Sequence, residues 1–433
     1  MPTNALLYLT HIFPYPGESF PDDELPILSQ GDWQIIVLPC GQYHDKKPPL
    51  PLPAHVYTDF RLLGHPLAKL LHILTPTGMR LLWQEWRHRR QRGQPFAWPG
   101  AIKACASAAF ARHKLRQLIR EQHLENSPLV VYSFWFSHHA MAMPLLRQEF
   151  PQLRYVSRAH GIDVYPERHP RGHLPFHGLR AMTPDILAPC SLHGLQTLQG
   201  EGIPVARLVL AHLGVPQVPN QPCPASADNE LALVSCSGML PVKRLSLLVR
   251  LLADLARQRP QMRITWHHLG DGPEGTQVRA AVEQLLRSLP NITPVLHGQL
   301  TPKGVRTFLT GAHCPLDALV NVSSKEGLPV SMMEALAAGL PVVGPDVGGV
   351  AEIITPETGV LLPADCDSKA FLQAMDALPA WKTPQKRARN QAFFAAHFQM
   401  DTNYRQFAET ILAQQFAISQ TLLATKALQA HDA

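Results

Sequence analysis

The sequence predicts an α/β protein with two doubly wound parallel sheets in two domains. Short apolar runs of β type alternate with longer segments of helical pattern, which is the order of βαβ units. The apolar runs lack polar alternation, so both faces of each sheet should be covered. The chain has 433 residues, which exceeds the roughly 250–300 residues at which a single hydrophobic core stops growing. Two domains are therefore expected.

Eleven apolar runs are predicted to be strands. Those in the first half of the chain are Ala5–Thr10, Trp33–Leu38, Pro128–Phe134, Arg154–Ser157 and Ile186–Pro189. Those in the second half are Leu231–Ser237, Arg263–Leu269, Thr293–His297, Ala318–Val322, Pro341–Gly344 and Val360–Leu362. The tail from Asp401 is predicted to be one helix, because apolar residues recur at helical spacing at Tyr404, Phe407, Ile411, Leu412 and Phe416.

The best candidate for a linker is Gly214–Glu230, which contains four prolines and little periodicity. It divides the chain into an N-terminal domain (1–216) and a second domain (217–395), followed by a C-terminal helical segment (396–433).

Composition excludes several classes of protein. Apolar residues make up 45% of the chain and charged residues 17%, which argues against a disordered or collagen-like chain. The seven cysteines are odd in number and have no C-x-x-C spacing, so we expect reduced thiols in a cytoplasmic protein. The N-terminal apolar run Ala5–Leu9 is too short for a signal peptide. No run approaches the ~20 apolar residues of a transmembrane helix.

Positive charge is concentrated between Gly78 and His123, which contain ten Lys or Arg and two acidic residues, whereas the whole chain carries +6. Trp83 and Trp86 lie among these arginines. Tryptophan and arginine on one amphipathic stretch suit an anionic membrane surface, which would place the protein peripherally on the inner face of the cell membrane. The alternative is a solvated helical face. A local patch argues against nucleic-acid binding.

The clearest chemistry lies in residues 318–350. A buried strand leads into Ser323 to Pro329, and a helix is predicted to begin at Val330 and to end before Gly339, which suits a left-handed helix end. The unbonded N–H groups and the dipole at the helix start form an anion site at the carboxyl edge of a sheet.

Two carboxylates, Glu326 and Glu334, accompany this anion site. They cannot neutralise a phosphate, whereas a carboxylate accepts two O–H bonds well, so sugar hydroxyls are the better partners. Taken alone, the pair could equally be a helix cap and a solvated helix residue.

Five linked segments between Ser235 and Leu362 resemble the donor domain of glycosyltransferase family 4, whose members are retaining enzymes of the GT-B fold. In chain order these are Ser237 to Arg244 (SGMLPVKR), Leu269 to Pro273 (LGDGP), Val295 to Gly298 (VLHG), Ser323 to Val343, which contains EGLP and EALAAGLPVV, and Gly348 to Gly359. The resemblance implies two Rossmann-like domains facing a central cleft, with a C-terminal helix that crosses back to the first domain.

On this resemblance, Lys243 would contact the donor diphosphate and Glu334 the ribose hydroxyls. Glu326 would hold the donor sugar and phosphate together with the backbone of Gly327, Leu328, Pro329 and Val330. The glycine turn would add Asp271 and Gly272 to the donor site. Gly238 stands where the family usually has arginine, which removes one cation from the diphosphate. Either Arg244 compensates or the donor is held less tightly.

Two phrases in the first half also resemble this family. His11 to Pro26 (HIFPYPGESFPDDELP) resembles the opening FPYPPGE-F-x-x-E-I, and Gly17 would let that backbone approach the donor. Ser157 to Pro166 (SRAHGIDVYP) resembles S-R-A-H-G-x-D-x-Y, which would place His160 near the donor sugar and Asp163 close by. Without the family, these are a surface loop and a structural histidine.

No metal is expected. His169, His173 and His177 have the i, i+4 spacing of a metal face, but Pro170, Gly172 and Pro175 argue against a helix there. Asp365-Cys366-Asp367 spells D-x-D but reads better as a helix cap.

The sequence therefore predicts a retaining glycosyltransferase that moves a hexose-type unit from a UDP- or GDP-sugar to a glycan or lipid-linked acceptor in bacterial surface polysaccharide synthesis. His160, Lys243 and Glu326 would be its catalytic residues, and the leaving diphosphate would help to deprotonate the acceptor. Two alternatives remain. One is a non-catalytic GT-B protein that binds a glycan or a partner, which Gly238 favours. The other is a GT-B sugar-nucleotide epimerase, which would lack the Glu326–Glu334 pattern.

Overall fold

The structure is a computed structural model that describes residues 4–41, 43, 47–94, 96–169, 172, 174–218 and 222–431. The chain forms two compact units, Met1–Ala211 with Tyr404–Ala433, and His212–Asn403. The domain limits expected at residues 216 and 395 stay predictions. No helix of the described part is long and apolar enough to cross a bilayer.

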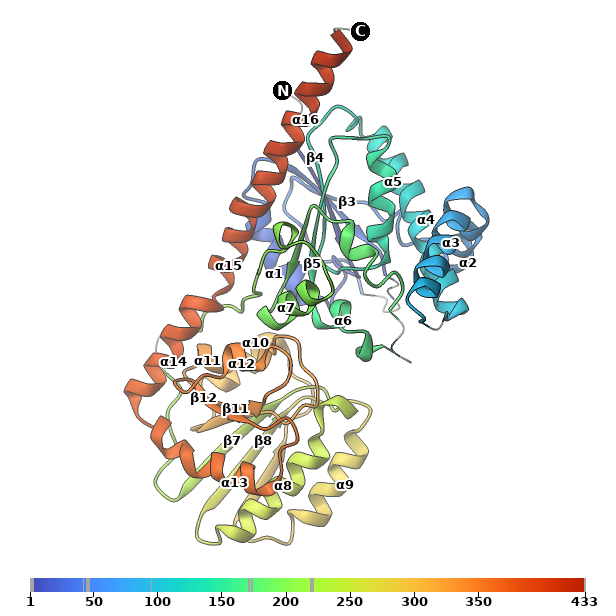
Figure 1. Cartoon of the computed structure of the whole chain (residues 1–433). Coiled ribbons are helices and arrows are strands. Elements are labelled where there is room, and N and C mark those ends of the chain that lie inside the picture. The colour runs from blue at the N-terminus through green and yellow to red at the C-terminus, as the bar shows by residue number, and fades with distance from the viewer. Residues whose placement is uncertain are drawn as a thin grey trace. The chain divides into compact units, whose positions relative to one another are not determined.

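The first unit is built on a parallel six-stranded sheet with the order β3-β2-β1-β4-β5-β6 (Figure 1). Its strands are β1 (Ala5–Thr10), β2 (Gln34–Pro39), β3 (Val56–Thr58), β4 (Leu129–Ser133), β5 (Arg154–Ala159) and β6 (Ile186–Pro189). Its helices before the C-terminal segment are α1 (Ser19–Leu28), α2 (Pro66–Leu71), α3 (Pro76–Gln91), α4 (Trp98–Glu121), α5 (Met143–Arg147), α6 (Gly161–Val164) and α7 (Leu192–Gly200).

The second unit repeats this topology in a parallel sheet with the order β12-β11-β10-β7-β8-β9. Its strands are β7 (Glu230–Cys236), β8 (Arg263–Leu269), β9 (Ile292–Leu296), β10 (Ala318–Val320), β11 (Val342–Pro345) and β12 (Gly359–Leu362). Its helices are α8 (Leu245–Gln258), α9 (Gly275–Leu285), α10 (Pro302–Leu309), α11 (Val330–Ala337), α12 (Val350–Ile353), α13 (Ser368–Ala377) and α14 (Pro384–His397).

All eleven predicted strands are confirmed, with ends that differ by at most a few residues. The prediction missed β3, which has three residues and pairs only with β2 at the edge of its sheet. So short a run lacks the apolar length that marks the other strands. Within the segment expected to be the linker, Val215, Val218 and Cys223 are buried in the core of the second unit.

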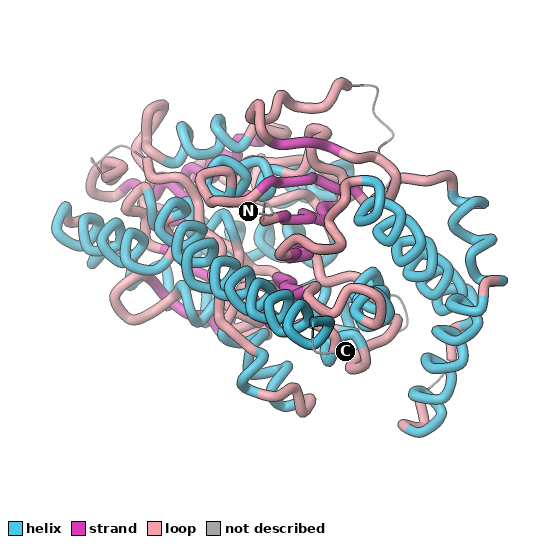
Figure 2. Tube along the Cα trace, turned by 90° about the horizontal axis from the view of Figure 1, so that it is seen from above, coloured by secondary structure: helices cyan, strands magenta, loops and turns pink. Residues whose placement is uncertain are grey.

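The C-terminal helix returns to the first unit, as predicted. It comprises α15 (Met400–Gln406), a π-helical turn (Phe407–Leu412) and α16 (Ala413–His431), and α16 runs beside β4 (Figure 1). Figure 2 shows α16 as the long helix that leads to the C-terminus. The Ser419 hydroxyl accepts from the Leu129 amide at 2.9 Å and donates to the Gln152 carbonyl at 2.7 Å. Phe416 stacks on Trp33 with ring centroids 5.1 Å apart. The predicted apolar positions of this helix are all buried.

A buried ionic cluster joins the first sheet to α1. Glu24 and Arg158 are fully buried, and their charged groups lie 2.9 Å apart. The hydroxyls of Tyr8 and Tyr132 both donate to the Glu24 carboxylate. The guanidinium of Arg158 also lies 4.0 Å from the ring centroid of Phe407 in the returning helix. This cluster ties three sheet strands, α1 and the C-terminal segment together behind the loops that follow β1 and β5.

Candidate functional site

The strand order of the second sheet reverses between β7 and β10, which is where ligands bind in open α/β sheets. After β7 the chain forms a 3₁₀ turn, η7 (Pro241–Lys243), and after β10 it forms the loop that leads to α11. The Lys243 ammonium lies 2.7 Å from a Glu326 carboxylate oxygen, which also accepts from the Asn321 amide at 3.0 Å. The structure thus brings two of the three expected catalytic residues into one ion pair.

Three backbone contacts fix the loop that carries Glu326. The Ser324 amide donates to the Val242 carbonyl at 2.8 Å, and the Gly349 amide donates to the Gly327 carbonyl at 2.8 Å. Gly348 has φ +57°, and a Cβ there would lie 2.0 Å from the Glu326 carbonyl oxygen. Only glycine permits this approach. The loop is therefore held from both sides, which positions the Glu326 carboxylate.

The start of α11 has no side-chain cap, and Pro329 is its N-cap. Its use as an anion site stays a prediction. The helix ends before Gly339, whose φ of +79° confirms the expected left-handed end. Glu334 lies on this helix, is 7% exposed and approaches Arg306 at 3.7 Å. This edge therefore combines uncapped helix N–H groups and one lysine with two buried carboxylates.

The glycine turn after β8 packs against the segment after β7. Gly270 has φ +137°, and a Cβ there would lie 2.0 Å from the Ser237 carbonyl oxygen. The Met239 amide donates to the Asp271 carbonyl at 3.1 Å. The Gly272 amide donates to the Asp271 carboxylate at 2.8 Å, and this bond is the main reason that the carboxyl pKa is lowered. The turn thus shapes the backbone around Gly238.

Gly238 itself is not required by packing. A Cβ at this position would meet its nearest atom, the Asp271 carbonyl oxygen, at 3.6 Å, an ordinary contact. Arg244 is already engaged: its guanidinium donates to the carbonyls of Val322, Ser323 and Ala364 at 2.6, 3.2 and 3.1 Å. Its compensation for the missing arginine stays a prediction, and its visible role is to tie η7 to the β10 loop.

In the first unit, His160 follows β5 and is 8% exposed. Its Nε2–H donates to the Phe134 carbonyl at 2.9 Å, and its ring packs on Trp135 with centroids 4.4 Å apart. Burial, with the nearby Arg158 charge, lowers its pKa to about 3. His160 is therefore a neutral imidazole at physiological pH, and it cannot act as an acid there.

Asp163 caps α6 rather than standing free. Its Oδ2 accepts from the amides of His160 and Phe136 at 3.0 and 3.2 Å, and burial raises its pKa to about 6. Gly17, with φ +118°, shapes the loop after β1. The sequence prediction missed Glu18, whose carboxylate accepts from the amides of His11, Ile12 and Phe13 and from the Trp135 indole. Glu18 lies within the segment His11 to Pro26, whose resemblance to the family was the sequence signal that could have identified it.

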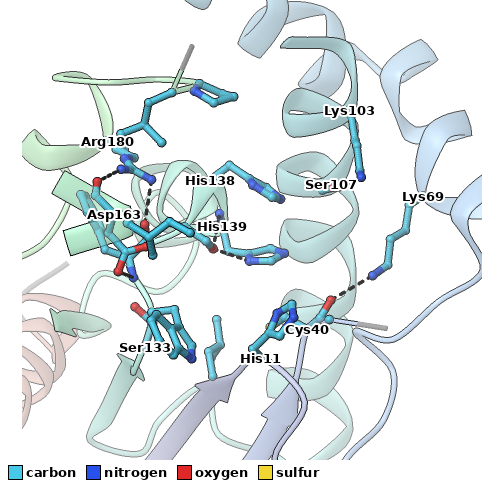
Figure 3. Close-up of a pocket in the computed structure, with 18 of the residues that line it drawn as sticks. His11, Cys40, Lys69, Lys103, Ser107, Ser133, His138, His139, Asp163 and Arg180 are labelled. Carbon is cyan, nitrogen blue, oxygen red and sulfur yellow. Dashed lines mark hydrogen bonds between the residues drawn. The ribbon is translucent and has the colours of Figure 1, made fainter. Parts of the chain in front are cut away.

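A cavity of about 950 Å³ opens at the switch point of the first sheet, beyond the ends of β1 and β4 (Figure 3). Its wall is largely apolar and includes Leu9, Pro66, Leu70, Ala106, Trp135 and Phe136. The polar side chains that line it include Lys69, Lys103, His138, His139, Asp163 and Arg180. The position and size fit a ligand pocket. The sequence did not single out this pocket, because its residues come from segments far apart in the chain.

The metal expectations can be compared only in part. His173 lies outside the described residues, and His169 and His177 are not on one helix. No group of three or more His, Cys, Asp or Glu in the described segments could hold a metal ion. Asp367 caps α13 by accepting from the Ala370 amide at 2.8 Å, which confirms the helix-cap interpretation of the D-x-D sequence.

Comparison with known families matches residues 231–380 to the family described as glycosyl transferases group 1. The chain is 25% identical over 242 residues to WcaL of Escherichia coli K12, a putative colanic acid biosynthesis glycosyltransferase, and this match spans 54% of the chain and 58% of WcaL. A shorter match, 38% over 77 residues, covers 17% of the chain and 22% of the lipopolysaccharide core biosynthesis mannosyltransferase LpsB of Rhizobium meliloti. The chain thus spans about half the length of the first curated relative.

Solved structures confirm the GT-B fold. The lipopolysaccharide outer core galactosyltransferase WaaB superimposes with a TM-score of 0.66 at 12% identity, over 95% of this chain and 99% of WaaB. HepE of Anabaena, solved with UDP, superimposes with a TM-score of 0.62 at 14% identity, over 94% of this chain and all of HepE. At these identities the likeness establishes the fold alone.

Proposed function

We propose, from the premise that residues 231–380 form a glycosyl transferases group 1 domain, that this chain is a retaining glycosyltransferase. It transfers a sugar from a nucleotide-sugar donor to a glycan or lipid-linked acceptor in bacterial surface polysaccharide synthesis. The observation that carries the proposal is the Lys243–Glu326 pair beside the uncapped start of α11 and Glu334.

Each part of that edge has a task in the transfer. The bond between the sugar C1 and the diphosphate oxygen breaks, a bond from C1 to the acceptor oxygen forms, and the acceptor proton passes to the diphosphate. Lys243 and the N–H groups of α11 stabilise the charge that grows on the diphosphate. Glu334 accepts hydrogen bonds from the ribose hydroxyls, and Glu326 orients Lys243 and the sugar. No protein nucleophile is needed.

His160 has a narrower role in this proposal. Its Nε2–H is occupied by the Phe134 carbonyl, so this N–H is not available to a sugar hydroxyl. Because its pKa is about 3, it contributes no positive charge. His160 therefore positions the sugar and does not protonate it.

The donor is proposed to be a UDP- or GDP-sugar, used without a metal ion. HepE was solved with UDP, and a mycobacterial relative with 45% identity over 56 residues is described as a GDP-mannose-dependent α-mannosyltransferase. Lysine and helix N–H groups can neutralise a diphosphate in place of a cation.

Calorimetric titration with UDP, GDP, ADP and CMP tests the donor site. One nucleotide should bind the wild-type chain, and Lys243→Ala and Glu334→Ala should each weaken it by about tenfold or more. Lys369→Ala, an exposed lysine of α13, is the matched control and should bind as the wild type does. Binding of all four nucleotides with no effect of either variant would contradict the proposed site.

A second candidate function rests on Gly238. The chain lacks the arginine that its motif usually has, so it could bind a glycan or a partner without catalysis. Because a Cβ at Gly238 has room, Gly238→Arg should fold. A gain of about tenfold in nucleotide affinity together with appearance of transfer activity only in the variant would favour this candidate. Transfer by the wild-type chain would exclude it.

Membrane contact is proposed for α3, within the basic stretch 78–123. Met79 and Trp83 are exposed, and Arg87 and Arg90 lie over the rings of Trp83 and Trp86, each at 5.1 Å. Part of the basic charge is used inside the unit: Arg89 pairs with buried Glu85, and Arg116 and Arg120 pair with Glu149.

This surface would hold the protein peripherally on the inner face of the cell membrane. The full chain should float with vesicles that contain anionic phosphatidylglycerol and not with neutral ones, and Trp83→Ser with Arg87→Ser should release it. Equal flotation with neutral vesicles would contradict an electrostatic contact.

A further inference from the structure

The cavity of the first unit has a chemistry of its own. Three cationic side chains line it, Lys69, Lys103 and Arg180, against the single carboxylate of Asp163 among its described lining residues. Arg180 is turned toward the protein, since it donates to the carbonyls of Phe136 and Asp163. The two lysines are left for a ligand.

Lys69 and Lys103 come from different helices, α2 and α4, and both reach the cavity (Figure 3). Lys69 donates to the Cys40 carbonyl at 3.2 Å, and no salt bridge joins either lysine to a described carboxylate. Burial and the neighbouring Lys103 charge lower the pKa of Lys69. Two ammonium groups facing one hollow repel each other, and a bound anion would remove that repulsion.

A second observation points to a ligand with hydrogen-bonding oxygens. His138 and His139 turn toward the same hollow in Figure 3. The Nε2 atom of His138 is buried and has no hydrogen-bond partner in the described structure. Burial is the main cause that lowers its pKa to about 4, so it is a neutral ring with one unused polar nitrogen. Such an atom is costly to leave unpaired.

The wall that carries Lys69 continues outward as an apolar ridge. Helix α2 and the following turn η1 (His72–Leu74) contain no buried residue. Their exposed leucines are 44% to 73% exposed: Leu67, Leu70, Leu71 and Leu74. Pro66 and Leu70 line the cavity, so the apolar surface runs from its interior onto the ridge. A concentration of leucines of this kind marks a binding surface.

We propose that this cavity binds the acceptor through a phosphate group held by Lys69 and Lys103, with an attached hydrocarbon chain along the leucine ridge of α2. The acceptor is thus a lipid-linked phosphate or diphosphate rather than a free glycan. This inference rests on the proposed transferase function and names the acceptor class for it. The phosphate is a binding handle and does not react.

Farnesyl diphosphate is a suitable probe, because it joins a diphosphate to a prenyl chain. Farnesol supplies the chain without the charge, and inorganic pyrophosphate supplies the charge without the chain. In calorimetric titrations of the full chain, farnesyl diphosphate should bind at least about tenfold more tightly than either half. Equal binding of pyrophosphate would overturn the lipid part of the proposal, and equal binding of farnesol would overturn the phosphate part.

Substitutions test whether farnesyl diphosphate binds in the cavity of the first unit. Lys69→Ala with Lys103→Ala should weaken farnesyl diphosphate binding by about tenfold or more, and Leu70→Gln should remove the advantage over pyrophosphate. The variant Lys369→Ala, at an exposed lysine of the second unit, should leave it unchanged. Loss in Lys243→Ala with none in the Lys69 and Lys103 variant would overturn the assignment.

Nucleotide binding is measured on the same samples. A chain that binds its nucleotide but not farnesyl diphosphate would overturn the acceptor class and leave the donor site intact. A chain that binds neither would overturn both. Unchanged thermal unfolding and nucleotide affinity in the lysine variants show that they are folded, so that their effect is local.

Discussion

The two sheets share one strand order but end in different chemistry. At the switch point of the second sheet, the loops after β7 and β10 bring a lysine and two carboxylates to the start of α11. At the switch point of the first sheet, the loops enclose a cavity of about 950 Å³ with a largely apolar wall and two lysines. Equivalent backbone positions therefore support a polar site in one unit and an amphiphilic pocket in the other.

The difference shows that topology supplies the place and side chains supply the function. Both sheets direct their loops to the carboxyl edge, where ligands bind. In the second unit, glycines press backbones together, as at Gly270 and Gly348, and the site is compact. In the first unit, residues of α2 and α4 line the cavity together with the ends of β1 and β4, and the cavity has room for a larger ligand.

The largest expected effect, a loss of stability in the first unit and not in the second, comes from Arg158→Met. It leaves the fully buried Glu24 without its cation, which should cost the first unit about 3–5 kcal/mol. Chemical unfolding followed by tryptophan fluorescence measures the loss, and nucleotide binding by the second unit should persist in the variant. The exposed Arg80→Met should change stability by less than about 0.5 kcal/mol. A first unit that stays as stable as the wild type would show that the ion pair is dispensable.

A smaller effect, confined to the second unit, is expected from Lys243→Met. Removing a charge-assisted contact to the diphosphate should lower kcat/KM by about 100-fold, near 3 kcal/mol. The exposed Lys303→Met on α10 is the control and should retain full activity. Because Glu326 would be left unpaired in Lys243→Met, the double variant with Glu326→Gln separates a stability loss from a catalytic one. Equal rates for the Lys243 and Lys303 variants would refute the role of Lys243.

Glu334→Gln should have an effect of about tenfold that depends on the ribose. The wild-type chain should bind its nucleotide better than the 2′,3′-dideoxy analogue by about that factor. The variant should bind both equally, because glutamine accepts hydroxyl protons less strongly than a carboxylate. Calorimetric titration of the wild-type chain and the variant with each of the two nucleotides measures the four affinities. An undiminished preference for the ribonucleotide in the variant would assign the ribose to another residue.

The smallest effect concerns pH and the first unit. His160 has a folded pKa of about 3, so below its ordinary value near 6.5 the unfolded chain takes up a proton that the folded chain does not. The free energy of unfolding should therefore decrease as the pH is lowered, by about 0.7 kcal/mol between pH 7 and pH 6 for this one group. Asp163, with a folded pKa of about 6, takes up part of its proton in the folded chain over the same range, which opposes this loss by about 0.4 kcal/mol.

His160→Asn should flatten this part of the stability curve, whereas the exposed His55→Asn should not. Denaturant unfolding at pH 7 and at pH 6 gives both slopes. The same slope in His160→Asn as in the wild type would mean that His160 is not held neutral by burial.

Much of the second unit could be predicted because its information is local. Pro329, Val330 and Gly339 signal the start and end of α11, and the apolar runs before and after them signal buried strands. Gly348, which makes a close backbone contact, also lies in one of the five segments quoted from the sequence, Gly348 to Gly359. The D-x-D cap at Asp367 was predictable for the same reason, since a cap bonds to an amide three residues away.

The first unit was less predictable because its contacts are distant in sequence. Glu18 closes its own loop but also accepts from Trp135, which is 117 residues away. Asp163 follows a motif histidine, yet it serves as a cap for α6 and for the Phe136 amide. Lys69 and Lys103 meet only because α2 and α4 flank one cavity. No spacing rule links such residues.

The sequence alone determined the two parallel sheets and the start and end of α11, because periodicity and helix-end signals act over a few residues. The return of the C-terminal helix was implied by the family resemblance. The tertiary structure alone decided that Arg244 is engaged by three carbonyls, that His160 is neutral, and that an amphiphilic cavity faces two lysines. Burial, desolvation and the meeting of distant helices set these properties, and they exist only once the chain has folded.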